Sequence, residues 1–308
     1  MNLSNGQVDY ITRLQNSVVG NSKEERTLQD AHTLASTLAH LAVASLIEEV
    51  SLTPKPGLVD KKDQGSHDDL TYTMMVNSAR SLHETFYEMA MVSFGQRPSQ
   101  ILREKIGEIG RKGENTMFQV TNGVNTHKGA IWSLGLLTAA AAIHKGQSDE
   151  LAMCFTAGEI ARFEDRNIPP QITNGIKVVN KYGVNGAKVE AQMAFPHIRQ
   201  ISLPIFKSSH NQFNYVMAKF YSFLALMANL DDTCVLHRGG LEGLKYVKQY
   251  AGKVLESGNF NELQKMNEEF KKRRLSPGGS ADLLAATIYL FKICQMNLPI
   301  QRELATIH

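Results

Sequence analysis

The most constraining feature of this sequence is a long run of apolar residues that recur every three or four positions. Between residues 213 and 228 the stripe consists of Phe213, Val216, Met217, Phe220, Tyr221, Leu224 and Ala228. These positions share one face of an α-helix, whereas a β-strand would place apolar residues at every second position. The stripe persists for about four turns, so we predict a core helix here.

Weaker patterns of the same period cover most of the remaining chain. Leu34, Leu38 and Leu41 begin one such face, which runs to about Val50 and ends at the Pro-Lys-Pro-Gly stretch of residues 54–57. No stretch rich in Val, Ile and Thr alternates with period two, and the fold is therefore predicted to be all-α. Further helices are expected at 72–93, 99–119, 128–145, 149–163, 171–181, 239–256, 259–273 and 280–296.

Neither a Ser/Gly-rich linker nor an internal repeat divides the chain. Residues 1–26 are polar and weakly patterned, so we expect a tail or a short surface helix there. Residues 27–308 are expected to form a single compact multi-helix domain, and the hydrophobic content of 43% is enough for a sizeable core.

Charge and cysteine content exclude several classes of protein. The 33 basic and 30 acidic residues give a formal net charge of +3, too small for a nucleic-acid-binding surface. Cys154, Cys234 and Cys294 lie far apart without zinc-ligand spacing, so reduced thiols are expected. No signal peptide and no apolar run of about 20 residues is present, which predicts a cytoplasmic protein without a membrane span.

Four loops carry more glycine, proline and isolated charge than helix connections need. The first runs from Thr53 to Asp69. Two prolines stiffen it, and Lys55, Asp60, His67 and Asp69 lie within a short reach. Such a group suits phosphate or metal binding, although a solvated connection between helices could have the same composition.

The second loop, residues 121–129, precedes an apolar, Ala-rich helix that Asn125 or Thr126 is expected to cap. A helix start presents unpaired N–H groups and a positive dipole end. Gly123 permits close approach, and His127 and Lys128 add donors, so the loop is a candidate phosphate site. No GxxxxGK[ST] motif and no GxGxxG after a strand is present. His127 could equally be a structural residue near a helix end.

The third segment, residues 231–243, places Asp231 and Asp232 ahead of Arg238 and the pair Gly239 and Gly240. Carboxylates are hard oxygen ligands that suit Mg²⁺, which usually takes only one or two of them and fills its other positions with water and substrate phosphates. Capping of the following helix by Asp231 is the structural alternative.

The fourth segment, residues 274–282, leads into another apolar helix, for which Ser280 is the expected cap. Gly278 and Gly279 would let a ligand approach the backbone. The basic run at 271–274 is interpreted as a solvated helix end that interacts with the helix dipole.

Stretches from all four segments resemble one enzyme family, the ATP:dephospho-coenzyme A triphosphoribosyl transferases of citrate lyase and malonate decarboxylase systems. The matching stretches are EVSLTPKPGLVD (49–60), TNGVNTHKGAIWSLGLL (121–137), HRGGLEGL (237–244), SPGGSADLLA (276–285) and, more weakly, YGVNGAKVEA (182–191). Ordered matches over most of the chain are far more specific than one short motif. The chain is similar to the citrate-lyase type, but Cys234 stands where the family commonly has Asn, and GAKVE at 186–190 where it has Gly-Ala-Arg-Gly-Glu.

The resemblance implies that the enzyme breaks the ribose–adenine bond of ATP and joins the triphosphoribosyl group to the 2′-hydroxyl of 3′-dephospho-coenzyme A. The triphosphate stays attached and serves as a handle for positioning. Carboxylates near the anomeric carbon would stabilise its oxocarbenium character. The product would pass to a holo-acyl-carrier-protein synthase of the citrate lyase system.

The resemblance also implies roles for individual residues, with glycine-rich loops at helix N-termini forming the nucleotide site. The expected catalytic residues, among which the general base and general acid stay unassigned, are His127, Asp60, Asp69 and Glu242. The expected ligands of Mg²⁺ are Asp69, Asp231 and Asp232. The expected substrate-binding residues are Lys55, His67, Asn122, Gly123, Asn125, Thr126, Lys128, Arg238, Gly239, Gly240, Ser276, Gly278, Gly279 and Ser280.

Three alternatives stay open. The same synthase could serve malonate decarboxylase instead of citrate lyase. A magnesium-dependent helical hydrolase would let water attack the N-glycosidic bond and would free adenine without dephospho-coenzyme A. A noncatalytic helical adaptor would account for the amphipathic helices but not for four charged, glycine-rich loops. A homo-oligomer is compatible with the sequence.

Overall fold

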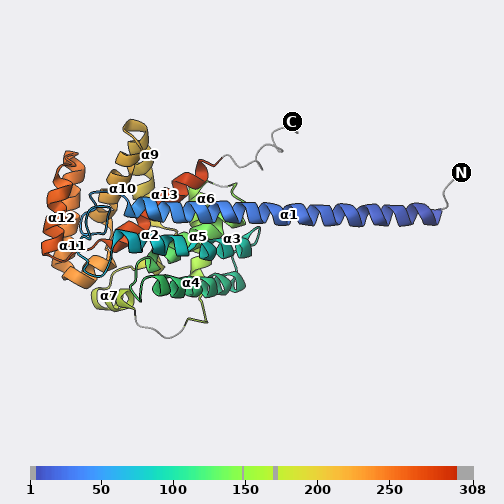
Figure 1. The fold of residues 1–308 in the computed structure, drawn as a ribbon, viewed down its shortest axis with the longest axis horizontal. Coiled ribbons are helices and arrows are strands. Elements are labelled where there is room, and N and C mark those ends of the chain that lie inside the picture. Colours follow the sequence, from blue (N-terminus) through green and yellow to red (C-terminus); the bar gives the residue numbers. More distant parts are fainter. Residues whose placement is uncertain (1–4, 148, 169–172, 297–308) are drawn as a thin grey trace.

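A computed structural model describes residues 5–147, 149–168 and 173–296, with side chains from residue 24 onward, and over these ranges its regular structure is entirely helical (Figure 1). The all-α prediction is therefore confirmed. In chain order the helices are α1 (Asn5–Val50), α2 (Tyr72–Ser81), α3 (His83–Ser93), α4 (Gln100–Val120), α5 (Lys128–Ile143), α6 (Glu150–Arg162), α7 (Asn174–Tyr182), α8 (Ala187–Gln192), the π-helix η1 (Ile198–Ser202), α9 (Leu203–Gln212), α10 (Tyr215–Asn229), α11 (Thr233–Ser257), α12 (Glu262–Lys272) and α13 (Gly278–Cys294).

Helices α5 and α13 form the centre of the molecule. Almost every residue of α5 from Ala130 to Ala142 is buried, and the same holds for most of α13. A helix that is apolar on all sides must be covered on all sides. Accordingly, α5 packs against α1, α3, α4, α6 and α13, while α13 also packs against α10. The hydroxyl groups of Thr138 and Tyr289, 2.8 Å apart, satisfy each other between the two central helices.

Helix α1 runs without interruption from Asn5 to Val50, and its first half projects from the body of the molecule (Figure 1). Most of the segment expected to be a tail or a separate short helix is therefore part of α1. Its second half buries Leu34, Leu38 and Leu46, and it packs on α3 and α13. Among the described residues, Glu24–Val50 is the one helix long and apolar enough to cross a membrane, but 56% of its apolar window is buried inside the protein, as in a core helix.

Most expected helices are present, but four details differ. The helix expected at 72–93 is divided at Leu82, whose N–H donates to the Ala79 carbonyl and tightens the turn. Segments 187–192 and 198–212 are helical although no regular stripe marks them. The helix expected at 239–256 starts at Thr233 and contains a kink at Gly240. Positions 171–172 and 295–296 of the expected helices lie outside α7 and α13, and 171–172 lie outside the described residues.

Candidate active site

The loop between α1 and α2, residues 51–71, meets α11 and the start of α13 at His67. The Nε2 atom of His67 lies 2.8 Å from Ser276 Oγ. Arg238 donates to the Ser66 carbonyl oxygen at 3.1 Å, and its second nitrogen lies 3.1 Å from His67 Nδ1. Burial and the nearby Arg238 guanidinium lower the pKa of His67 to about 4. At neutral pH the imidazole is therefore uncharged, and its Nδ1 can accept from Arg238.

Asp232 joins the third segment to the fourth. Its Oδ1 atom accepts the backbone N–H of Cys234 at 2.9 Å and so caps α11. Its Oδ2 atom accepts the N–H of Ser280 at 2.8 Å and the Ser280 hydroxyl at 2.9 Å, while the Gly279 N–H donates to Oδ1 at 3.2 Å. Burial raises the pKa of Asp232, although these donors oppose the shift. One carboxylate therefore fixes the starts of two helices.

Asp282, in the second turn of α13, joins the fourth segment to the second. Its Oδ2 atom lies 2.0 Å from the position that a Cβ atom on Gly129 would take, so a side chain there would displace this carboxylate. The Ala130 backbone N–H donates to the same carboxylate, at the start of α5. The four sequence segments are thus in contact with one another around the N-termini of α5, α11 and α13.

Lys55 and Asp60 shape the inside of the first loop. The side chain of Lys55 is buried, and its Nζ lies 2.6 Å from Glu49 Oε1. Asp60 is also buried, and it accepts the backbone N–H groups of Lys55, Lys62 and Asp63 at 2.9, 2.7 and 2.9 Å. Both side chains therefore organise the loop in this state, and neither presents its charge on an open surface.

His127 is the residue immediately before α5, and its imidazole is 3% exposed. Its Nδ1 atom lies 2.9 Å from Ser78 Oγ, which in turn lies 2.6 Å from Thr126 Oγ1. Its Nε2 atom is buried without a hydrogen-bond partner. Burial, and to a lesser extent the positive charge of Lys55, lower the pKa of His127 to about 3. The ring is neutral at pH 7, and its Nε2 is one of the few buried polar atoms without a partner among the described residues.

The turn before His127 is the most open part of the site. Asn122 and Gly123 have φ angles of 53° and 85°, and no atom lies within 4 Å of the place where Gly123 would carry a Cβ. Asn125 accepts the backbone N–H of Lys128 at 3.2 Å, although the N-cap residue of α5 is His127 and neither Asn125 nor Thr126. The ammonium of Lys128 lies 2.7 Å from a carboxylate oxygen of Glu114.

Several backbone N–H groups expected to cradle phosphate already have partners within the protein. The N–H groups of Gly279 and Ser280 donate to Asp232, and the Gly123 N–H donates to the Phe118 carbonyl at 2.8 Å. Ser280 does not cap α13 with its own side chain, because the helix begins earlier, at Gly278, and Asp232 serves the start of this helix from another segment. Asp231 likewise does not cap α11. Carboxylates thus occupy helix starts that the sequence suggested for phosphate.

The expected metal ligands do not form one centre. Asp232 is committed to the helix starts described above, and Asp231 lies 2.5 Å from Lys248 Nζ. Asp69 is 60% exposed beside His67. Among the residues that the structure describes, no group of three or more His, Cys, Asp and Glu side chains could hold a metal ion. Glu242 is exposed on α11 and stays a prediction only.

The glycines of the third segment serve packing and backbone geometry. A Cβ on Gly239 would lie 2.3 Å from Leu275 Cδ2, so glycine lets α11 approach this buried leucine without displacing it. Gly240 has φ 59° and ψ −162°, which only glycine adopts readily, and produces the kink in α11. Gly239 and Gly240 therefore determine where the turn of α11 that carries Arg238 lies.

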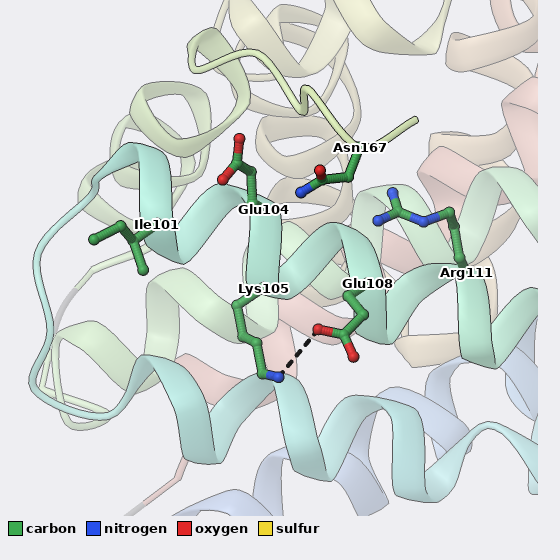
Figure 2. A pocket seen from close by; sticks show the side chains of 6 residues that line it. All are labelled: Ile101, Glu104, Lys105, Glu108, Arg111 and Asn167. Carbon is green, nitrogen blue, oxygen red and sulfur yellow. Dashed lines mark hydrogen bonds and ion pairs between the residues drawn. The ribbon is translucent and has the colours of Figure 1, made fainter. Parts of the chain in front are cut away.

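A surface pocket of about 410 Å³ lies elsewhere, along α4 (Figure 2). Figure 2 shows Glu104, Glu108 and Arg111 on this helix, with Asn167 across from them. None of its lining residues belongs to the four segments. This pocket therefore lies apart from the candidate active site.

Glu49, Ser78 and Asp282 were not among the expected site residues. Ser78 lies in the expected 72–93 helix, and nothing in its local sequence marks it as a partner of His127. Glu49 and Asp282 do occur within two of the family-like stretches, EVSLTPKPGLVD and SPGGSADLLA. Their position within stretches that resemble the family was the one sequence feature that could have identified them as site residues.

Comparison with known proteins agrees with the resemblance. A family model described as ATP:dephospho-CoA triphosphoribosyl transferase matches residues 35–299. A 2-(5''-triphosphoribosyl)-3'-dephosphocoenzyme-A synthase of Klebsiella pneumoniae is 41% identical over 85% of this chain and 96% of the relative. A probable synthase of the same name from Pseudomonas syringae pv. syringae is 44% identical over 84% of this chain and 91% of the relative. No solved structure matches the chain.

Proposed function

Because this chain belongs to the ATP:dephospho-CoA triphosphoribosyl transferase family, we propose that the cluster around His67, His127 and Asp282 is the active site of a triphosphoribosyl-dephospho-CoA synthase. The enzyme is a transferase. It takes the 5-triphosphoribosyl group of ATP, joins it to the 2′-hydroxyl of 3′-dephospho-CoA and releases adenine.

One observation carries the choice of site, namely that four family-like segments from distant parts of the chain contact one another at one end of the helical core. A reaction between two large substrates needs groups from several elements held in a fixed arrangement. The shared carboxylate of Asp232 and the buried Glu49–Lys55 pair supply that rigidity.

Arg238 is the best-placed group for the triphosphate. Its guanidinium is held by the Ser66 carbonyl and by neutral His67, yet the residue is exposed. A preoriented arginine binds phosphate oxygens with two parallel hydrogen bonds at little entropic cost. Lys128 is a second candidate, because its ammonium is about one third exposed and its carboxylate partner Glu114 can release it.

His127 is suited to accept a proton and not to donate one. Its imidazole is neutral and its Nε2 atom has no partner. Removal of the proton from the attacking hydroxyl requires such an acceptor within hydrogen-bond reach. Binding of a polyanion nearby raises the basicity of the ring, because a negative charge favours its protonated form.

Magnesium enters this proposal with the triphosphate and not through a cage of protein ligands. The exposed carboxylate of Asp69 fits a single contact to the ion beside Arg238 and His67, whereas Asp231 and Asp232 already have partners. Magnesium commonly keeps its waters and binds through phosphates with only one or two carboxylates. When bound, the ion would neutralise part of the triphosphate charge.

The physiological context is part of the same proposal. We place the protein in the cytoplasm, with its product passed to a holo-acyl-carrier-protein synthase of the citrate lyase system. Malonate decarboxylase is the alternative acceptor system.

A homo-oligomer would be detected by light scattering of the purified protein.

The direct test combines purified protein, ATP, Mg²⁺ and 3′-dephospho-CoA, followed by mass spectrometry. We expect free adenine together with a coenzyme that is heavier by one triphosphoribosyl unit, and neither product without the acceptor. Adenine release in the absence of dephospho-CoA would instead identify a hydrolase. No binding of ATP by calorimetry would favour a noncatalytic adaptor.

A further inference from the structure

The Asp282 side chain connects the start of α13 to the start of α5. Its carboxylate lies against Gly129 and receives the Ala130 N–H. His127, the residue before α5, provides no side-chain cap for this helix. Asp282 therefore serves as a cap from a distant segment, which by itself is a structural role. Its electrostatic surroundings and its neighbour His127 indicate more than capping.

The charged groups that face Asp282 come from several elements. Glu49 at the end of α1 and Asp232 before α11 repel its negative form, while Lys55 in the first loop attracts it. The ammonium of Lys55 is already paired with Glu49, and that of Lys128 is paired with Glu114. Among the described residues Asp282 has no ion-pair partner of its own. Burial, and then repulsion by Glu49, raise the pKa of Asp282 well above its ordinary value.

The same helix start holds a neutral imidazole with an unpaired nitrogen. His127 precedes Gly129 by two positions, and its Nδ1 is held by Ser78. Its Nε2 is buried and has no hydrogen-bond partner. One helix start thus holds a carboxyl that keeps its proton and, two positions from its contact at Gly129, an imidazole that has lost its own. An acid and a base held on one element can act in one step.

Resting on the proposed synthase function, we propose that Asp282 is the general acid that protonates adenine as it leaves ATP. The 2′-hydroxyl oxygen of dephospho-CoA forms a bond to C1′ of the ribose while the C1′–N9 bond breaks, and the electron pair of that bond stays on adenine. The proton of the Asp282 carboxyl moves to an adenine ring nitrogen, and the hydroxyl proton moves to His127 Nε2. Proton exchange through solvent then restores both groups.

The first test is Asp282→Asn. The amide oxygen can still accept the Ala130 N–H and the side chain keeps its size, but it cannot supply the proton. We expect kcat to fall about 10²- to 10⁴-fold, with an unchanged thermal midpoint. Asp149→Asn is the matched control, because Asp149 caps α6 by accepting the Ala152 N–H and follows the opposite end of α5. An unchanged rate for Asp282→Asn would overturn the proposal.

The second test separates proton donation from capping. An ATP analogue methylated at N7 of adenine carries a cationic base, which leaves without an added proton. Asp282→Asn should use this analogue at nearly the wild-type rate. A loss equal to that seen with ATP would mean that Asp282 only supports the structure, and would overturn the proposal.

A third measurement needs the wild-type protein alone and so does not depend on the folding of a variant. With ATP, kcat should fall at alkaline pH as the acid loses its proton, and this fall should be absent with the methylated analogue. An identical alkaline fall with both substrates would contradict the role of Asp282. Failure of the wild-type protein to release adenine in the presence of dephospho-CoA would instead contradict the synthase function itself.

Discussion

The ammonium of Lys55 lies 2.6 Å from the carboxylate of Glu49, and both side chains are almost completely buried. This ion pair connects the end of α1 to the first loop of the candidate active site. Lys55 was expected to bind phosphate, but here its charge is already balanced inside the protein. Substitutions in this pair therefore test how much it stabilises the first loop of the candidate active site.

Replacing Glu49 alone should be costly. Glu49→Gln leaves the Lys55 ammonium buried without a counter-charge, so we expect a loss of about 3–5 kcal/mol in the free energy of unfolding. The combined change Glu49→Leu with Lys55→Met should recover most of this loss. Urea denaturation measures both. Glu108→Gln, in an exposed pair with Lys105, is the control and should leave the midpoint unchanged. An equal effect of the buried and the exposed variants would contradict this account.

A side chain at Gly129 is predicted to displace the Asp282 carboxylate. In Gly129→Ala the added Cβ would overlap Asp282 Oδ2, so the carboxylate must move. We expect about 1–3 kcal/mol of destabilisation and a loss of kcat similar to that of Asp282→Asn. The control is Gly252→Ala in α11, where no atom lies near the added carbon. Alanine should stabilise the helix there by up to about 1 kcal/mol. Full activity of Gly129→Ala would show that the position of Asp282 is unimportant.

Arg238 is predicted to bind the triphosphate, and Arg274 is its matched control. Loss of hydrogen bonds to a charged group costs about 1.5–3 kcal/mol, so Arg238→Ala should lower kcat/KM for ATP by roughly 10- to 150-fold without unfolding the protein. Arg274→Ala removes a guanidinium that is 78% exposed next to Asp68 and should change kcat/KM little. Steady-state kinetics with ATP as the varied substrate decides between them. Similar losses for both variants would indicate only a general effect of positive charge.

His127 predicts how stability depends on pH. Its pKa is about 3 in the folded protein and about 6.5 in an unfolded chain. Between these values the unfolded chain binds a proton that the folded protein does not. The free energy of unfolding should therefore decrease as pH falls from about 6.5 toward 3, by up to about 1.4 kcal/mol per pH unit for this group. His67 acts in the same direction.

The variant His127→Gln should make this acid decline shallower, because glutamine does not titrate. Urea midpoints measured from pH 7 to pH 4 provide the comparison. The same variant should also lose activity at pH 7. At this pH His127 is largely neutral in both the folded and the unfolded protein, so its titration contributes little to the difference in stability between variant and wild type. A decline as steep as in the wild type would mean that His127 is not buried in its neutral form.

The helical architecture could be predicted because it follows from local patterns. Most of the Phe213–Ala228 stripe falls on α10 (Tyr215–Asn229), but Phe213 is the C-cap residue of α9, and both Phe213 and Val216 are exposed and lie outside the core. The apolar segment after residue 129 is the buried helix α5. The missed helix α9 (Leu203–Gln212) buries Leu203, Phe206 and Ser209 at helical spacing, but only two of these are apolar and Lys, Ser, His and Asn make up much of the rest, so no apolar stripe marks it. The break at Leu82 was also missed, since both flanking helices bury apolar faces and the period hardly changes across it.

The candidate site was predicted less completely, because its partners are far apart in the sequence. The loops that meet at His67 were identified in advance, and so was the helix start at His127. Capping was assigned wrongly at α13, since Ser280 is the nearest suitable residue in the sequence whereas Asp232 is the one that packing brings there. Ser78 could not have been linked to His127, because only the packing of α2 beside the second loop brings them together.

The sequence by itself determined that the chain is helical, where most helices lie, which loops are chemically unusual and which family the chain resembles. These properties depend on residues that are neighbours along the chain or on patterns within one segment. Only the tertiary structure decided that helix starts suggested for phosphate are taken by Asp232 and Asp282, and that Lys55 neutralises Glu49. A buried polar group must find a partner wherever packing provides one, and local sequence does not contain that choice.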